Sequence, residues 1–210
     1  MTSDRFPLKS ALALMAMGLA AAVLLAGLNE LTREAIAEAR EQRALATLNQ
    51  VLDPGLYDNQ LNEDTITLTI DGQDRAALLY RARLDGSPVA AIIDMTTSRG
   101  YSGDIRLLLA ITPEGVILSV RVVDHRETPG LGDKIEHRRS EWIEQFDGRS
   151  LSNPERSRWA SDQRGGDFDT LTSATITSTA VIDAVARALA SVEHAGDAVW
   201  TAEAGSTLPR

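Results

Sequence analysis

The stretch TLTSATITST, residues 170–179, contains seven Ser or Thr side chains in ten positions. An apolar pattern typical of one helix face follows directly, with Val181, Ile182, Val185 and Leu189 recurring at helical spacing. Hydroxyl residues are common at a helix start, because their oxygens accept hydrogen bonds from the first free backbone N–H groups. One such residue is enough for a cap. Composition alone therefore favours a helix cap with more hydroxyls than it needs, next to the edge of a polar strand. A second role for the other hydroxyls stays open.

The second role that suits these hydroxyls is to hold a phosphate. A helix N-terminus offers free N–H groups and the positive end of the helix dipole, and both favour an anion. The hydroxyls cannot act as nucleophiles unaided, and no histidine stands at a spacing that suggests a base. Covalent chemistry at this stretch would therefore need an outside enzyme.

A second stretch with unusual composition is RETPGLGDKI, residues 126–135. Gly130 and Gly132 let the backbone turn sharply and approach a ligand closely, because glycine has no Cβ. Glu127 and Thr128 stand at the mouth of this loop, where they can hydrogen-bond a polar ring edge. An ordinary strand-to-helix connection explains the glycines but not the Glu-Thr pair.

A third stretch, SRGYSGDI at residues 98–105, places an aromatic side chain inside a Gly-x-x-Gly turn. A tight turn between strands explains the glycines, and Tyr101 is a candidate to stack on a ring. Trp142 and Trp159 are core residues by default. Trp142 follows the glycine-containing loop by about two helical turns, so it is the better placed to lie against a bound ring. The neighbouring His125 is interpreted as structural or solvated.

The N-terminus contains 20 uncharged residues, positions 10–29. As a helix they span roughly 30 Å, the thickness of the hydrocarbon core of a bilayer. A cleaved signal peptide is the competing interpretation, but this run is longer than a usual signal sequence core and continues into a helix-forming segment. We therefore expect an uncleaved transmembrane helix. Arg5 and Lys9 predict that the short N-terminal end stays in the cytoplasm, with the main domain in the periplasm of a bacterium.

Charge and composition exclude several classes of protein. The formal net charge of −9 argues against nucleic-acid binding, which needs a basic face. The chain has no cysteine, so disulfides, thiolate zinc sites and iron–sulfur clusters are excluded. Its three histidines show no metal-ligand spacing, and we expect no metal site.

The pattern along the rest of the chain predicts an α+β domain with an antiparallel-rich sheet and flanking helices. The segments that read as strands are residues 65–70, 76–84, 89–94, 105–111 and 116–123. Beyond Gly132 the pattern indicates one or two short helices, then a long polar loop over 147–169. The expected divisions are a cytoplasmic end at 1–9, a transmembrane helix at 10–29, a helical stalk at 30–55, a periplasmic domain at 56–195 and a flexible tail at 196–210.

The three unusual stretches occur in this order behind a single anchor, and there the chain resembles a known family. It is similar to the FMN-binding domain shared by the G subunit of the Rnf electron-transport complex and the C subunit of the sodium-pumping NADH:quinone reductase. In that family a threonine carries the flavin in a motif of the form Asp-x-x-Ser/Thr-Gly/Ser-Ala-Thr. The positions that match in DTLTSAT are Asp169, Thr172, Ser173, Ala174 and Thr175, with Ser173 at the usual glycine. The compact length and short N-terminal end resemble the Rnf G subunit.

The resemblance implies that Thr175 carries FMN as a phosphoester, installed from FAD by a separate flavin transferase. Thr172, Ser173 and Thr177 would then solvate the charge of the phosphodiester. The residues expected at the polar edge and floor of the ring are Glu127, Thr128, Gly130 and Leu131, with Tyr101 and Trp142 as aromatic neighbours. The chain would act as an electron relay in the bacterial inner membrane, together with the other subunits of its complex.

Three alternatives remain open at the level of sequence. The chain could be a membrane-anchored binding module without a cofactor, whose Ser/Thr run is only structural. It could be the equivalent subunit of the quinone reductase. It could also be a free-standing periplasmic oxidoreductase, which would turn over without partner subunits.

Overall fold

The computed structural model describes residues 8–209, so most of the predicted cytoplasmic end lies outside the described residues. The chain divides into two compact units, Met1–Ala46 and Thr47–Arg210. The described part of the first unit belongs to a single helix, α1 (Leu8–Leu48), of 41 residues. Since α1 runs without interruption through residues 10–29, the helical conformation expected there is confirmed.

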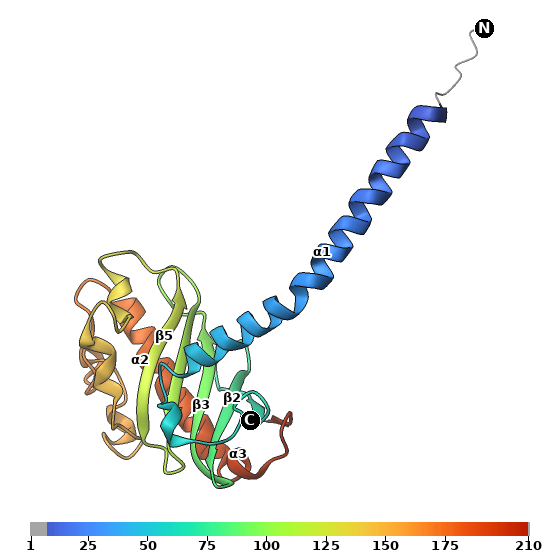
Figure 1. The fold of residues 1–210 in the computed structure, drawn as a ribbon. Coiled ribbons are helices and arrows are strands. Elements are labelled where there is room, and N and C mark those ends of the chain that lie inside the picture. Colours follow the sequence, from blue (N-terminus) through green and yellow to red (C-terminus); the bar gives the residue numbers. More distant parts are fainter. Residues whose placement is uncertain (1–7, 210) are drawn as a thin grey trace. The chain divides into compact units, whose positions relative to one another are not determined.

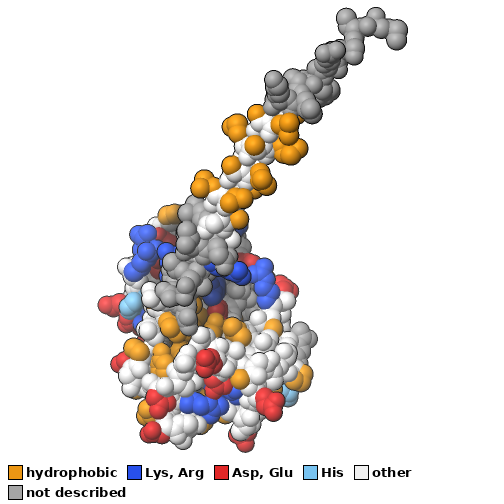
Figure 2. All heavy atoms as spheres, turned by 45° about the vertical axis from the view of Figure 1, so that its right-hand side comes forward, with side chains coloured by type: hydrophobic (Ala, Val, Ile, Leu, Met, Phe, Trp, Pro, Cys, Tyr) orange, Lys and Arg blue, Asp and Glu red, His pale blue; other side chains and the backbone are white. Residues whose placement is uncertain are grey.

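The stretch Ala11–Gly27 of α1 is apolar, and its side chains are exposed on every side. Leu14 is 70% exposed and Leu24 is 73% exposed, and Figure 2 shows such apolar side chains along this helix. A helix that is apolar all round is either buried in a large core or a membrane span. The helix Thr175–Ala195 is also long and apolar enough to cross a membrane, but 61% of its 18-residue apolar window is buried within the structure. That helix is therefore a core element of the second unit.

The second unit is built on a six-stranded sheet with the order β5-β4-β3-β2-β1-β6 (Figure 1). The strands are β1 (Thr65–Leu68), β2 (Ala77–Leu84), β3 (Ser87–Thr97), β4 (Ile105–Ile111), β5 (Ile117–His125) and β6 (Thr207–Leu208). Neighbouring strands are antiparallel, except that β6 pairs with β1 in parallel. The predicted antiparallel-rich α+β fold is confirmed.

Both faces of the sheet are covered, because successive strand residues point to opposite faces. On β3, Ala91, Ile93 and Met95 join one hydrophobic cluster, and Ala90 and Ile92 join the other. The first cluster packs against α2 (Thr175–Ala195), which lies across one face of the sheet (Figure 1). The second is closed by the apolar side chains Leu48, Val51, Leu52 and Leu61. The sheet is thus buried on both faces.

Between β5 and α2 the chain forms short 3₁₀ helices. They are η2 (Gly132–Ile135), η3 (Glu141–Phe146), η4 (Arg156–Arg158) and η5 (Asp162–Arg164). Phe146, Trp159 and Phe168 stack together in the core, with ring centroids 4.4–6.4 Å apart. These contacts hold in place a segment that the sequence predicts as a long polar loop. Trp159 is a core residue, as expected.

The segment after α2 differs from the flexible tail that the sequence predicts over 196–210. Within the described residues it forms α3 (Ala198–Thr201) and β6, and Val199 is fully buried. The buried Arg81 donates to the carbonyl of Ala202 at 2.7 Å, and Arg83 donates to that of Trp200 at 2.8 Å. The prediction failed because these bonds come from distant β2 side chains, which local composition does not reveal.

A short 3₁₀ helix, η1 (Pro54–Leu56), follows α1 at the DPG break.

Candidate functional site

The helix α2 starts at Thr175, and its N-cap residue is Ala174, whose side chain cannot accept a hydrogen bond. The hydroxyl-rich stretch therefore does not cap the helix, contrary to the simplest interpretation of its composition. Instead, the hydroxyl of Thr177 points to Glu127, and that of Ser178 donates back to the carbonyl of Ala174 at 3.0 Å. The first turn of α2 keeps its free N–H groups without a side-chain cap, which is the condition for anion binding at a helix start.

A cavity of about 420 Å³ lies in front of this helix start. It is large enough for a cofactor-sized ligand. Its lining residues come from the three stretches singled out in the sequence: Tyr101, Glu127, Thr128, Leu131, Gly132, Thr172, Ser173, Ala174, Thr175, Ile176 and Thr177. We call this the ring cavity. The tertiary structure thus brings together nine of the twelve site residues expected from the sequence.

The rim of the ring cavity carries exposed apolar side chains. Tyr101 is 69% exposed, Ile176 is 57% exposed and Leu131 is 44% exposed. Clustered apolar side chains at the surface mark sites where a ligand or partner covers them. A planar ring fits between such side chains, because it can bury its faces against them. Ile176 was missed by sequence reasoning, although its signal is visible: it is an apolar residue off the buried face of α2.

Glu127 forms the polar floor of the ring cavity and is only 5% exposed. Its carboxylate accepts a hydrogen bond of 2.6 Å from the hydroxyl of Thr177. Its other oxygen accepts from the backbone N–H of Ser102 at 3.0 Å. Two donors from two different stretches therefore hold this carboxylate, as a buried charge requires.

Two glycines are needed for Glu127 to occupy this place. A Cβ at Gly132 would lie 2.8 Å from the Cβ of Glu127 and 3.4 Å from the Thr177 hydroxyl. A Cβ at Gly100 would lie 2.7 Å from a carboxylate oxygen of Glu127 and 2.4 Å from the carbonyl of Gly103. The glycines of both turns thus have two roles: they allow the turns, and they leave room for the carboxylate to pack closely against the backbone.

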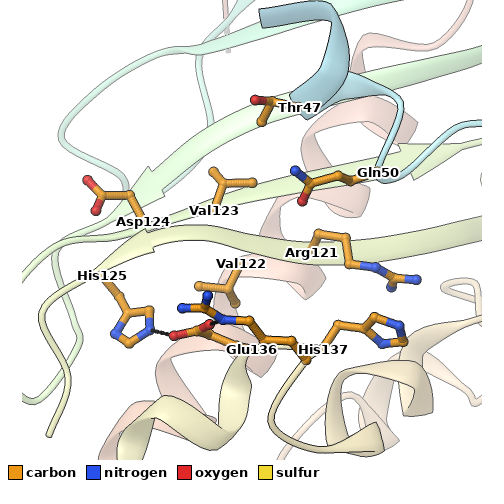
Figure 3. Close-up of a pocket in the computed structure, with 10 residues that line it drawn as sticks. Thr47, Gln50, Arg121, Val122, Val123, Asp124, His125, Glu136 and His137 are labelled. Atoms are coloured by element: carbon orange, nitrogen blue, oxygen red, sulfur yellow. Dashed lines mark hydrogen bonds and ion pairs between the residues drawn. The ribbon is translucent and has the colours of Figure 1, made fainter. Parts of the chain in front are cut away.

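His125 positions the backbone at Glu127. The Glu127 N–H donates to Nδ1 of His125 at 3.0 Å, so Nδ1 is an acceptor and the proton of the neutral ring is on Nε2. Nε2 then donates to Glu136 at 2.9 Å (Figure 3). His125 is therefore structural, which is one of the two roles expected for it.

Figure 3 shows these groups at a second cavity, of about 680 Å³, beside β5. Arg138 donates to the second oxygen of Glu136, and this hydrogen bond holds the pKa of Glu136 below its usual value. Burial opposes the shift, and the hydrogen bond from His125 adds to it. The cavity also carries Arg121 and His137. Through His125, this charged network is linked to the backbone N–H of Glu127.

Asp169, Gly130 and Trp142 are the expected site residues that do not line the ring cavity. The indole N–H of Trp142 donates to the backbone carbonyl of Asp169 at 2.8 Å. The side-chain oxygen of Gln145 accepts from the Asp169 N–H at 2.8 Å. Trp142 thus holds the first residue of the DTLTSAT motif.

Gln163 is a further residue that sequence reasoning missed. Its amide donates to the hydroxyl of Thr175 at 3.3 Å and to that of Thr170 at 3.3 Å. It lies in the polar segment 147–169, whose lack of periodicity offers no signal for any one residue.

Comparison with known proteins shows the family. Residues 100–190 match the model of the FMN-binding domain, and residues 1–51 match that of the RnfG N-terminal region. The G subunit of the ion-translocating oxidoreductase complex of Salmonella typhi is 44% identical over 166 residues, 79% of this chain and 81% of that protein. The same subunit of Escherichia coli K12 is 43% identical over 79% of this chain and 81% of that protein. That of Pseudomonas aeruginosa PAO1 is 41% identical over 88% of each chain.

Among solved structures, the crystal structure of Shewanella oneidensis NqrC is similar at 20% identity, with a TM-score of 0.44. It covers 64% of this chain and 66% of the other, a likeness too low to support an inference. The sequence relatives are decisive, since they share more than 40% identity over most of both chains. The chain belongs to the family of the G subunits of ion-translocating oxidoreductase complexes.

Proposed function

We propose that this chain is the FMN-carrying electron-transfer subunit of a membrane-bound ion-translocating oxidoreductase, with FMN esterified through its phosphate to Thr175. The observation that carries the proposal is the position of Thr175. It stands at the uncapped start of α2, in the lining of the ring cavity. Eight of the other ten lining residues are ones that the family resemblance assigns to the flavin.

The residues present fit a flavin. The rim of Tyr101, Leu131 and Ile176 offers apolar surface to the ring, and Glu127 and Thr128 offer hydrogen-bonding groups to its polar edge. The hydroxyls of Thr172 and Ser173 lie beside the attachment point. FMN supplies the redox chemistry when bound, and the protein supplies position and local charge. A covalent link keeps the flavin at high effective concentration outside the cytoplasm.

The apolar helix at Ala11–Gly27 anchors the chain in the bacterial inner membrane. With basic residues before it, the N-terminal end stays in the cytoplasm and the FMN domain is periplasmic. The divisions proposed at 1–9, 10–29 and 30–55 follow from this topology. The partners are the other subunits of the complex and a flavin transferase that attaches the FMN. Because the chain relays electrons, we expect almost no turnover by the isolated subunit.

The test is the intact mass of the full chain, expressed with and without a flavin transferase. With the transferase, the mass should rise by that of FMN less one water, and denatured protein should stay yellow. Thr175→Ala should abolish the increase. Thr170→Ala, which removes a neighbouring hydroxyl outside the ring cavity, should keep it.

A colourless chain of unmodified mass in cells that contain the transferase would refute the proposal. The binding module without cofactor would then be the better explanation. Turnover by the isolated chain would instead support the free-standing oxidoreductase.

A further inference from the structure

A third cavity shares Thr175 and Ile176 with the ring cavity. It has a volume of about 370 Å³, and Thr175 lines both it and the ring cavity. Its polar lining includes Arg99, Ser161, Gln163, Arg164 and Asp183. We call it the arginine cavity. A group attached to the Thr175 hydroxyl therefore has two spaces beside it, one with an apolar rim and one with cationic side chains.

The hydroxyl of Ser161 has no hydrogen-bond partner, although the residue is only 1% exposed. An unpaired buried hydroxyl is costly, and native structures seldom leave one without a reason. Ser161 lines the arginine cavity. Its Oγ atom is covered in this conformation, so a ligand there gains the hydroxyl as a partner once the side chain turns toward the cavity. This observation is independent of the helix start and points to a polar ligand.

The charge of the arginine cavity indicates the sign of that ligand. Its ionisable side chains are two arginines and one aspartate, in a chain with a formal net charge of −9. Arg164 lies 3.3 Å from the carboxylate of Asp183, so one arginine is partly compensated. Arg99 adds a further positive charge, and the uncapped N-terminus of the 21-residue α2 adds its dipole. The cavity thus favours an anion.

We infer that the arginine cavity is the phosphate subsite of the flavin, with Arg99 and Arg164 as the residues that neutralise the phosphate. The inference rests on the function proposed above. The amide of Gln163, which donates to the Thr175 hydroxyl at 3.3 Å, and the hydroxyl of Ser161 are the neutral donors. The ring then occupies the ring cavity, and Thr175 joins the two subsites.

The experiment compares two probes that differ only in the phosphate. The full chain is purified from cells without flavin transferase, so that Thr175 is unmodified, and is titrated with FMN and with riboflavin. The wild type should bind FMN at least about tenfold more tightly than riboflavin, since each charge-assisted hydrogen bond contributes about tenfold or more. In the double variant Arg99→Gln/Arg164→Gln, FMN affinity should fall to that of riboflavin, while riboflavin affinity is unchanged.

Three controls make the comparison specific. Arg156→Gln removes an exposed arginine that pairs with Glu193 on α2 but lies outside the arginine cavity, and it should keep the preference for FMN. The charge-conserving Arg99→Lys/Arg164→Lys variant should retain most of the preference. Ser161→Ala should reduce it in part. Equal binding of FMN and riboflavin to the wild type, or a preference that survives in the double Gln variant, would overturn the inference.

A second readout is the initial rate at which limiting flavin transferase attaches FMN. The double Gln variant should be modified at least about tenfold more slowly than the wild type, because the phosphate loses its charged partners. If neither free flavin binds measurably, this rate decides: a wild-type rate in the double variant overturns the phosphate subsite. Failure of the wild type itself to gain flavin would instead refute the proposed function.

Discussion

The hydroxyl of Thr177 donates a hydrogen bond of 2.6 Å to the carboxylate of Glu127, which is 50 residues away in the sequence. Both residues are buried, at 1% and 5% exposure. This bond joins the start of α2 to the loop after β5. It therefore couples the proposed attachment point, two residues earlier at Thr175, to the polar floor of the ring cavity.

Thr177→Val removes the donor and keeps the shape of the side chain. It should lower the free energy of unfolding by about 1–3 kcal/mol, the cost of leaving a buried acceptor short of a partner. It should also weaken flavin binding, because Glu127 loses one of its two anchors. Urea unfolding followed by tryptophan fluorescence measures the first effect, and FMN titration of unmodified protein measures the second. Thr96→Val, at a half-buried position of β3, should change neither by much. Equal effects of the two substitutions would argue against a role for this bond.

Gly132→Ala should displace Glu127, because the added methyl group would lie 2.8 Å from its Cβ. We expect the free energy of unfolding to fall by about 1–3 kcal/mol, the usual cost of overpacking. We also expect a lower affinity for the flavin. Gly55→Ala is the matched control, since its new Cβ would meet only ordinary contacts of 3.4 Å or more. Both glycines lie in short 3₁₀ helices. A neutral Gly132→Ala would show that the carboxylate can move freely.

Asp64→Asn should be strongly destabilising, because it leaves the buried Arg81 without its carboxylate. Arg81 is 2% exposed and donates to Asp64 at 2.7 Å, and Arg83 donates to the other oxygen at 2.6 Å. Removing one partner of a buried ion pair costs about 3–5 kcal/mol. Asp104→Asn breaks an exposed pair with Arg75 and should cost less than about 1 kcal/mol. Unfolding midpoints in urea compare the two, and a similar small loss for both would refute the structural role of Asp64.

Arg138→Gln should change how stability depends on acid pH. Glu136 has a lowered pKa, mainly through its hydrogen bond from Arg138, against an ordinary value of 4.5. Below the ordinary value the unfolded chain takes up a proton that the folded chain does not, so stability is lost as the pH falls through the folded pKa. Without Arg138 the pKa of Glu136 moves back up, and part of this acid-dependent loss should disappear.

The measurement for Arg138→Gln is the thermal unfolding midpoint from about pH 3 to pH 6. The wild type and the variant should differ more at pH 6 than at pH 3. Arg75→Gln, at an exposed pair away from Glu136, should lower the unfolding midpoint only slightly, and by a similar amount at each pH. Parallel curves for wild type and Arg138→Gln would contradict the expectation.

The elements of the fold were accessible from the sequence because their signals are local. The alternation in 65–70 and the apolar run at 105–111 predicted β1 and β4 to within a few residues, and the apolar spacing after residue 180 predicted α2. The turn chemistry at TPEG predicted the hairpin of β4 and β5. The structure of the tail, residues 196–210, was mispredicted because the contacts that fix it are not local. Its anchors, Arg81 and Arg83, are on β2, more than 110 positions away.

The sequence alone determined the class of fold, an apolar helix near the N-terminus and the three stretches that meet at the ring cavity. These are local features, because periodicity, turn residues and runs of one residue type act within a few positions. Tertiary structure alone decided that Ala174, not a hydroxyl, precedes α2, that Thr177 binds Glu127, and that Trp142 holds the backbone of Asp169. Each of these depends on which distant side chain the packed sheet brings within hydrogen-bonding distance, and no local pattern encodes that distance.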